Sequence, residues 1–274
     1  MTEIEHYGSG ASSRPPIEHV PSPPGIEAFS LEGKVALVVG GATGIGYAVA
    51  RSFVAAGARV YIAGRRADVG ESAAAELGAT SLVVDVRDGA SIDAAVDRIL
   101  AESGRLDVAV NGAGAGLNKP TVDTSDDEFE AVVQTNFGGV FRSCRAEARA
   151  MMRSGGGSIV NLASMSAHVV NFPQRQGIYN ASKAAVLHYT RSLAVEWAAD
   201  GIRVNSVSPG YTATALTEVS RGIPERLASW QERTPLGRIA DPSEIASAVL
   251  YLASGASSYA TGTDIVLDGG YSLW

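Results

Sequence analysis

The sequence predicts an α/β protein built on a doubly wound parallel sheet of seven strands, with helices on both faces. Three observations predict this fold. Short apolar runs rich in β-branched residues alternate with longer segments of helical periodicity. A glycine-rich turn joins the first apolar run to the first helical segment. Polar residues follow several of the runs, as they do where ligands bind at the carboxyl ends of parallel strands.

The chain of 274 residues, 46% of them hydrophobic and 19% charged, is long enough for one domain with a substantial core. We expect this domain to occupy residues 31–274. Residues 1–30 are polar and proline-rich, and we expect a flexible tail there. The tail lacks the basic start and apolar centre of a secretory signal.

The expected strands and helices alternate along the domain. The strands are short and apolar, and they span residues 34–39, 59–63, 81–84, 106–110, 158–163, 202–207 and 264–267. The helices span residues 47–56, 67–77, 90–103, 125–153, 179–197 and 242–253. The fourth helix begins with a capping box at Ser125 and is expected to be interrupted near Asn136, because each of the two glycines that follow costs about 1 kcal/mol relative to alanine. Asp241 and Pro242 mark the start of the last helix.

Composition and charge limit the kinds of partner that the protein is expected to bind. The formal net charge is −7 and no run of lysine or arginine occurs, which argues against a nucleic-acid partner. No apolar run reaches the ~18 residues of a membrane span, so no membrane partner is expected. Cys144 is the only cysteine, and its helical, partly apolar surroundings favour a packed side chain over a reactive thiol. The four histidines lack metal-ligand spacing, so no metal site is expected. These bounds predict a cytoplasmic protein.

The glycine-rich turn predicts a nucleotide site. Its residues Gly40, Thr43, Gly44, Ile45 and Gly46 lie between the first strand and the first helix. Such a turn lets the backbone approach a pyrophosphate, which then lies at the helix N-terminus.

The end of the second strand predicts the cofactor. An NAD-binding domain usually has a carboxylate there for the ribose 2′-hydroxyl, whereas this chain has Arg65 and Arg66, which suit a 2′-phosphate. NADP(H) is therefore favoured over NAD(H). Asp85, at the end of the third strand, is placed to hydrogen-bond an adenine. The turn that begins at Asn111 is as consistent with a structural role as with a cofactor contact.

Tyr179 and Lys183 are one helical turn apart and share a helix face. A cation about 4 Å from the phenol is worth about 4 kcal/mol at an effective dielectric of ~20, so we expect Lys183 to lower the pKa of Tyr179. The pair is then a candidate acid/base. Alone, the pattern is common by chance, and a surface tyrosine beside a solvated lysine is the alternative.

The ordered set of the glycine turn, Asn136, Ser164, Tyr179 with Lys183, and Pro209-Gly210 resembles the short-chain dehydrogenase/reductase family over about residues 31–274. The resemblance implies a Rossmann-type fold and an oxidoreductase that transfers hydride between a nicotinamide cofactor and a carbonyl or secondary alcohol. It implies that Tyr179 is the acid/base, that Lys183 binds the nicotinamide ribose and lowers the pKa of Tyr179, that Ser164 polarises the substrate, and that Asn136 holds a water in a proton relay. The implied cofactor residues are Gly40, Thr43, Gly44, Ile45, Gly46, Arg65, Arg66, Asp85, Val86, Asn111, Gly112, Ala113, Tyr179, Lys183, Pro209, Gly210, Thr212 and Thr214.

The chain departs from the family pattern at three positions. Val39 stands where threonine is usual, Gly112 where asparagine is usual, and Thr212 where isoleucine is common. The first two remove side-chain hydrogen bonds that brace turns, so they affect rigidity and affinity. None of the three removes a catalytic group.

The segments Met165 to Gln174 and Asp268 to Tyr271 are similar to the branch of mannitol 2-dehydrogenases and sorbose or xylulose reductases. A ketose or polyol substrate would need polar partners between Ser164 and Tyr179. The candidates for these partners are Ser166, His168, Asn171 and Gln174. The alternative is that His168 and Asn171 only brace the loop.

Two alternatives to a ketose/polyol enzyme stay open. One is a reductase of 3-oxoacyl thioesters or of other carbonyl compounds on the same scaffold. The other is a non-catalytic NADP(H)-sensing module, which the presence of all the catalytic groups disfavours. The family also implies a homotetramer, or else a dimer, to which the ending Tyr271 to Trp274 would contribute a buried anchor.

Overall fold

The computed structural model describes residue 23 and residues 25–274, so most of the predicted tail of residues 1–30 lies outside the described part. The described end of that segment is ordered as a short 3₁₀ helix, Gly25–Phe29. The Phe29 ring lies 6.3 Å from that of Tyr251 on the last long helix, and Leu31 is buried. The chain therefore joins the core slightly before the boundary predicted at residue 31.

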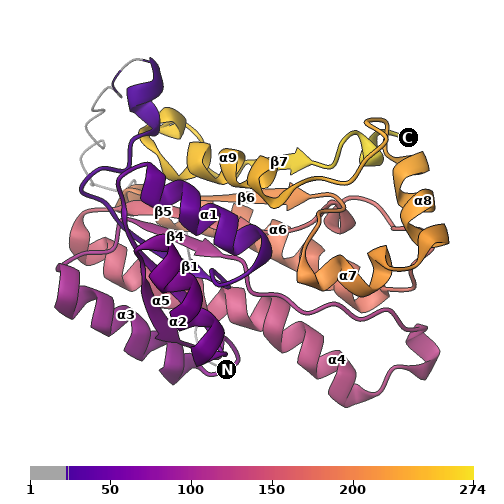
Figure 1. Cartoon of the computed structure of the whole chain (residues 1–274). Coiled ribbons are helices and arrows are strands. Elements are labelled where there is room, and N and C mark those ends of the chain that lie inside the picture. Colours follow the sequence, from indigo (N-terminus) through magenta and orange to yellow (C-terminus); the bar gives the residue numbers. More distant parts are fainter. Residues whose placement is uncertain (1–22, 24) are drawn as a thin grey trace, which may run out of the picture.

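The seven strands form one parallel sheet in the order β3-β2-β1-β4-β5-β6-β7, which confirms the predicted fold (Figure 1). The strands are β1 Val35–Val39, β2 Arg59–Gly64, β3 Thr80–Val83, β4 Val108–Asn111, β5 Gly157–Leu162, β6 Ile202–Pro209 and β7 Asp264–Leu267. Because β1 lies between β2 and β4, the strand order reverses at β1. A crevice is expected there, at the carboxyl ends of the strands.

Helices cover both faces of the sheet. They are α1 Gly44–Ala55, α2 Ala67–Leu77, α3 Gly89–Ser103, α4 Asp126–Val133, α5 Gly139–Ser154, α6 Gly177–Trp197, α7 Ala215–Arg221, α8 Pro224–Arg233 and α9 Pro242–Ala253. Successive side chains of β1 point to opposite faces: Leu37 packs with α3, α5 and α6, whereas Val38 packs with α1, α2 and α9. The remaining helical turns are 3₁₀ segments at Thr121–Asp123, Met165–Ala167, Ala198–Asp200, Gly255–Ser257 and Tyr271–Leu273.

The predicted interruption of the fourth helix is a π-helical turn, Gln134–Gly138, between α4 and α5. The predicted capping box at Ser125 opens α4. Neighbouring atoms explain both glycines after Asn136. A Cβ on Gly138 would lie 2.7 Å from Arg142 Nη1, and one on Gly139 would lie 2.9 Å from a methyl carbon of Val86. The wide turn brings Asn136 inward, where it is fully buried.

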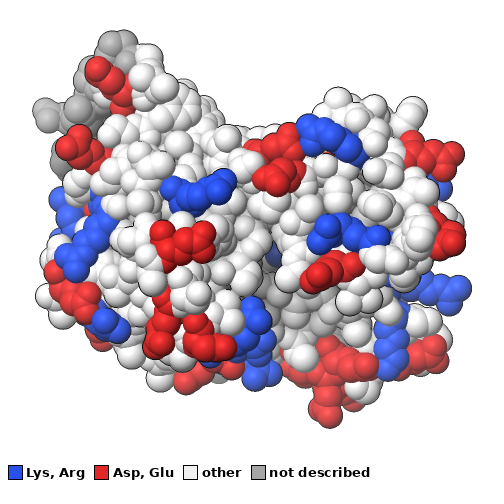
Figure 2. All heavy atoms as spheres, viewed as in Figure 1, with Lys and Arg blue, Asp and Glu red and all other residues white. Residues whose placement is uncertain are grey.

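Two helices were not predicted. α7 has only seven residues, and α8 buries only Trp230, so neither carries the long apolar stripe that reveals a helix in sequence. In addition, α1 begins at Gly44 rather than at residue 47, because the end of the glycine-rich turn is already helical. Figure 2 shows that the surface is hollowed between the side of α1 and α2 and the side of α7, with acidic and basic side chains interspersed around it.

Candidate active site

A cavity of about 350 Å³ lies at the carboxyl ends of β1, β2, β4, β5 and β6. Every predicted cofactor residue except Asn111 lines it. Ser164, Tyr179 and Lys183 line it as well, so the structure brings the glycine-rich turn and three of the four predicted catalytic residues to one space. Cavity residues that the sequence did not reveal include Thr135, Leu162 and Leu216.

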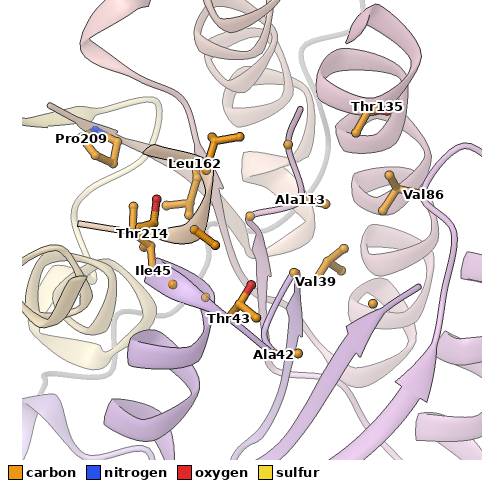
Figure 3. Close-up of a pocket in the computed structure, with 18 of the residues that line it drawn as sticks. Val39, Ala42, Thr43, Ile45, Val86, Ala113, Thr135, Leu162, Pro209 and Thr214 are labelled. Atoms are coloured by element: carbon orange, nitrogen blue, oxygen red, sulfur yellow. The ribbon is translucent and has the colours of Figure 1, made fainter. Parts of the chain in front are cut away.

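The floor of the cavity is backbone, because neighbouring atoms leave no room for side chains. A Cβ on Gly46 would lie 2.1 Å from the carbonyl oxygen of Gly40. A Cβ on Gly40, whose φ is +80°, would lie 2.9 Å from the backbone nitrogen of Ala113 on the neighbouring turn. At the same end the start of α1 lies against Thr214 (Figure 3), which is 3.2 Å from the Cβ position of Gly44.

This floor fits the pyrophosphate of a dinucleotide. Thr43 precedes α1 and makes no side-chain cap bond, so the amide groups of the first helical turn are free to receive an anion. Because Gly44 to Gly46 line the cavity, these amides are at its surface. The macrodipole of α1 adds to the attraction for negative charge.

Arg65 and Arg66 line the far end of the cavity, between β2 and α2, with Asp85 beside them. Asp85 accepts hydrogen bonds from the backbone nitrogen of Arg87 at 3.0 Å and from its guanidinium at 3.4 Å. The backbone bond from Arg87 lowers the pKa of Asp85, and the charges of Arg87 and Arg65 act in the same direction. Asp85 is therefore a carboxylate at neutral pH, and it retains acceptor capacity for a ligand amine.

Ser164, Tyr179 and Lys183 form the polar wall of the cavity. Ser164 follows β5 and is buried, and its Oγ accepts a hydrogen bond from the backbone nitrogen of Ser166 at 3.1 Å. Tyr179 and Lys183 lie one turn apart on α6, as predicted, with the Lys183 nitrogen 5.9 Å from the centre of the Tyr179 ring. Lys183 donates a hydrogen bond of 2.7 Å to the carbonyl of Leu162.

The expected lowering of the Tyr179 pKa is wrong for this arrangement. Burial raises the pKa of Tyr179, although a hydrogen bond with Ser164 acts against the rise. The Lys183 ammonium points to the Leu162 carbonyl rather than to the phenol, and burial lowers its own pKa to about 8. Desolvation therefore sets the direction of both shifts.

Asn136 does not line the cavity. Its Oδ1 accepts from the backbone nitrogen of Ala115 at 2.7 Å, and its Nδ2 donates to the Ala115 carbonyl at 2.9 Å and to Ser182 Oγ at 3.0 Å. A Cβ built on Gly114 would lie 3.6 Å from Asn136 Oδ1 and 3.8 Å from Lys183 Nζ. Asn136 and Lys183 therefore approach the same small space beside Gly114.

None of the four residues predicted to bind substrate lines the cavity. Ser166 Oγ lies 2.5 Å from Asn171 Oδ1, and Gln176 Nε2 donates to both side chains at 3.3 and 2.9 Å. Gln174 accepts from Tyr211 Oη at 3.2 Å. These contacts fix the loop between Ser164 and α6, and Gln176, which sequence reasoning missed, is at their centre.

His168 braces the same loop. Its Nε2 lies 2.8 Å from Asp264 Oδ2, and Asp264 also accepts from Ser206 at 2.6 Å and from Ser208 at 3.0 Å. The bond ties the loop after β5 to the start of β7. The structure thus supports the alternative in which His168 is a brace.

Asn111 is the one predicted cofactor residue that does not line the cavity. Its side chain points away from the cavity into the core, where its Nδ2 donates to Glu147 Oε2 and Asn161 Oδ1, both at 3.0 Å. The reason is its position at the end of β4, where alternate residues face opposite sides of the sheet.

The described residues contain no group of three or more histidine, cysteine, aspartate or glutamate side chains arranged to hold a metal ion. In the same residues, no helix combines the length and hydrophobicity needed to cross a bilayer.

Comparison with known proteins gives four further findings. The family described as Enoyl-(Acyl carrier protein) reductase matches residues 40–272. The chain is 44% identical over 249 residues to galactitol 2-dehydrogenase (L-tagatose-forming) of Cereibacter sphaeroides, covering 90% of this chain and 98% of that protein. It is 41% identical over 254 residues to a probable NADP-dependent mannitol dehydrogenase of Yarrowia lipolytica, covering 90% of each chain. The crystal structure of a short-chain type dehydrogenase/reductase from Mycobacterium marinum matches with a TM-score of 0.87 and 43% identity, over 91% of this chain and 99% of that chain.

Proposed function

This chain belongs to the short-chain dehydrogenase/reductase family, and we propose that it is an NADP(H)-dependent oxidoreductase that interconverts a ketose and a polyol. The observation that carries the proposal is the single cavity lined both by the glycine-rich turn and by Ser164, Tyr179 and Lys183. Relatives named for galactitol and mannitol support a polyol substrate.

The cofactor assignment rests on the two ends of the cavity, the glycine-rich turn at one end and the two arginines at the other. Glycine backbone and the start of α1 fit a pyrophosphate, while Arg65 and Arg66 supply two cations for a 2′-phosphate. A relative named as NADP-dependent supports the same choice. When bound, the nicotinamide supplies or takes up the hydride.

In the proposed reduction the carbonyl carbon gains a hydride and its oxygen gains the proton of Tyr179. Ser164, which lies beside Tyr179, turns its hydroxyl proton to the same oxygen. Since burial raises the Tyr179 pKa, the phenol keeps its proton at neutral pH until the substrate oxygen becomes basic enough to take it. This favours the reducing direction.

Lys183 and Asn136 support this step without contacting the substrate. Lys183 Nζ lies 5.9 Å from the centre of the Tyr179 ring, so its positive charge attracts the phenolate that remains after proton donation. The space beside Gly114, between Lys183 Nζ and Asn136 Oδ1, suits a water that returns a proton to Tyr179 by way of Lys183. We therefore assign Asn136 to holding that water rather than to contact with the substrate.

A substrate panel tests the function. NADPH oxidation should be fastest with a ketose among fructose, tagatose, sorbose and xylulose, and it should be slow with acetoacetyl thioesters. The description of the matching family names an acyl carrier protein substrate, so a reductase that acts on the 3-oxo group of an acyl thioester is the second candidate. Thioester turnover above that of every ketose would replace the first assignment with the second.

We also propose a cytoplasmic homotetramer. Phe129, Phe141 and Val195 are exposed apolar side chains on α4, α5 and α6, which suit contacts between subunits. Within one chain Tyr271 is already buried, whereas Leu273 and Trp274 are more than 80% exposed, so only these last two residues of the predicted anchor would need a second subunit to cover them. A buried, free Cys144 is compatible with a reducing compartment. Light scattering on the purified protein tests the tetramer, and a mass of one or two chains contradicts it.

A further inference from the structure

A group of buried polar side chains lies behind the polar wall of the cavity. It comprises Asn111 on β4, Cys144 and Glu147 on α5, Asn161 on β5 and Thr190 on α6, and we call it the Glu147 cluster. None of its members is more than 3% exposed, and Glu147 is fully buried. The proposed reaction uses none of these side chains.

Hydrogen bonds fix the direction of every amide in the cluster. Asn111 Nδ2 donates to Glu147 Oε2 and to Asn161 Oδ1, both at 3.0 Å. Asn161 Nδ2 donates to Thr190 Oγ1 at 3.0 Å, and Thr190 Oγ1 donates to the Val186 carbonyl at 2.9 Å. Reversing the Asn111 amide would place its oxygen against Asn161 Oδ1, so the network favours the orientation in which Nδ2 faces Asn161.

Two oxygens of the cluster have no hydrogen-bond partner, Asn111 Oδ1 and Glu147 Oε1. They belong to the two side chains that already share the bond from Nδ2 to Oε2. An unpartnered oxygen in the core is costly, and an ionised carboxylate with a single hydrogen bond is costlier still.

No cation offsets a charge on Glu147. The groups that face it from β4, β5 and α6 are uncharged amides and a hydroxyl, and on α5 its neighbour is the Cys144 thiol, whose pKa is raised well above its usual value by burial. On α6, Lys183 points to the Leu162 carbonyl and the pKa of Tyr189 is raised to about 12 by burial. On the outer side of α5 a separate depression shared with α3 holds the charged Asp93, Asp97, Arg149 and Arg153.

We infer that Glu147 is held as a neutral acid whose proton, on Oε1, is donated to Asn111 Oδ1, closing a ring of two hydrogen bonds between the acid and the amide. This single proton satisfies both unpartnered oxygens. Burial raises the pKa of Glu147 to about 7, which agrees with a proton retained into the neutral range. Glu147 is thereby a positioning residue for the cavity.

Glu147 can position the cavity because the two asparagines of the cluster directly precede cavity residues at the ends of β4 and β5. Asn111 directly precedes Gly112 and Ala113, which line the cavity. Asn161 precedes Leu162, whose carbonyl accepts the hydrogen bond of Lys183. Ionisation of Glu147 breaks the ring and places a buried charge against both strand ends, so the cofactor site loosens as the pH rises.

Ionisation of Glu147 should make the folded protein less stable as the pH rises. Because the folded pKa lies above the unfolded value of about 4.5, the stabilisation is complete below that value and is lost as the pH rises through about 7. Glu147→Gln, which carries a permanent donor in place of the acid proton, removes this dependence. Glu232→Gln, at an exposed position on α8, removes the same formal charge and serves as the control.

The experiment compares the full-length wild type with E147Q and E232Q from about pH 5 to about pH 8.5. The Tm of wild type relative to E147Q should fall by roughly 5 °C over this range, while E232Q follows wild type. Infrared spectra of wild type at low pH should show a protonated-acid band that E147Q lacks and that disappears near pH 7. NADPH affinity of wild type relative to E147Q should fall about 3- to 10-fold between pH 6 and pH 8.5.

A Tm difference that is constant with pH, or the absence of the acid band from wild type at pH 5, overturns the inference, since Glu147 would then be an ionised carboxylate solvated by buried water. The infrared measurement on wild type decides the matter even if E147Q fails to fold. The affinity comparison alone rests on the proposed cofactor. Absence of NADPH binding at every pH therefore contradicts the proposed function and leaves the thermal and infrared results to decide the inference.

Discussion

The two sides of the cavity are built in opposite ways. On the side of β1 and α1 the surface is backbone, and its shape depends on side chains that are absent at Gly40 and Gly46. On the side of β5 and α6 the surface is made by the polar atoms of Ser164, Tyr179 and Lys183. Substitutions on the two sides should therefore have different effects. An added methyl group on the first side should impair binding, whereas a removed oxygen on the second side should impair turnover.

Tyr179→Phe is the sharpest test of the polar wall. It removes the proton donor and leaves the glycine floor untouched, so turnover should fall by about 10³-fold or more while the Kd for NADPH changes only a few-fold. Steady-state kinetics and fluorescence titration of NADPH measure the two quantities. Turnover close to that of the wild type would remove Tyr179 from the reaction, and an equal loss in both quantities would erase the contrast between the two sides.

Gly46→Ala is the matching test of the floor. Its Cβ would lie 2.1 Å from the Gly40 carbonyl oxygen, so the turn must open and the affinity for NADPH should fall about 100-fold. Gly64→Ala is the control, because no atom lies within 4 Å of its Cβ position although Gly64 lines the same cavity. Similar affinities for the two variants, measured by the same titration, would contradict the packing argument.

Arg65→Glu tests the far end of the floor. Replacing a cation with an anion should weaken NADPH binding about 10-fold or more and leave NADH binding nearly unchanged, because only NADPH carries the 2′-phosphate. Arg153→Glu, an exposed charge reversal at the end of α5, controls for net charge. Equal losses for the two cofactors would remove the proposed phosphate site.

Lys183→Met tests how much the buried lysine of the polar wall lowers the stability of the folded protein. Burial lowers the Lys183 pKa to about 8, below its usual 10.5, so the folded protein is penalised below pH 8 and the penalty fades as the pH rises to about 10.5. The variant should therefore raise Tm by a few °C near pH 7, with a gain that shrinks toward pH 10, while turnover is lost. A lower Tm at pH 7 would show that the hydrogen bond from Lys183 to the Leu162 carbonyl outweighs desolvation.

The sheet could be predicted from sequence because its strands are buried on both faces. Continuous apolar runs such as Val35–Val39 are distinctive, and so are the cap signals of α4 and α9. α7 and α8 escaped prediction because α7 borders the cavity and α8 packs against α7, so neither presents a long apolar face to the sheet. They bury few side chains, and short polar helices resemble loops in sequence.

The site was predictable where the residue type alone determines the chemistry. Glycines at close backbone contacts and the spacing of Tyr179 and Lys183 are of this kind. Directions of side chains were not predictable. Asn111 and His168 were candidates for ligand contacts, with a structural role as the alternative, and their hydrogen bonds with Glu147 and Asp264 favour the alternative. The sign of the Tyr179 pKa shift depended on burial, which a sequence does not contain.

The π-helical turn Gln134–Gly138 sets the reading frame of the helix that follows it. A turn of this kind holds one residue more than an α-helical turn, and one residue corresponds to about 100° of rotation about the helix axis. Deleting a single residue here would rotate all sixteen residues of α5 together, and Cys144 and Glu147 would leave the side that faces the sheet. Apart from Asn136 and Gly138, whose side-chain contacts and close packing are described above, the segment should therefore accept a change of residue type more readily than a change of length.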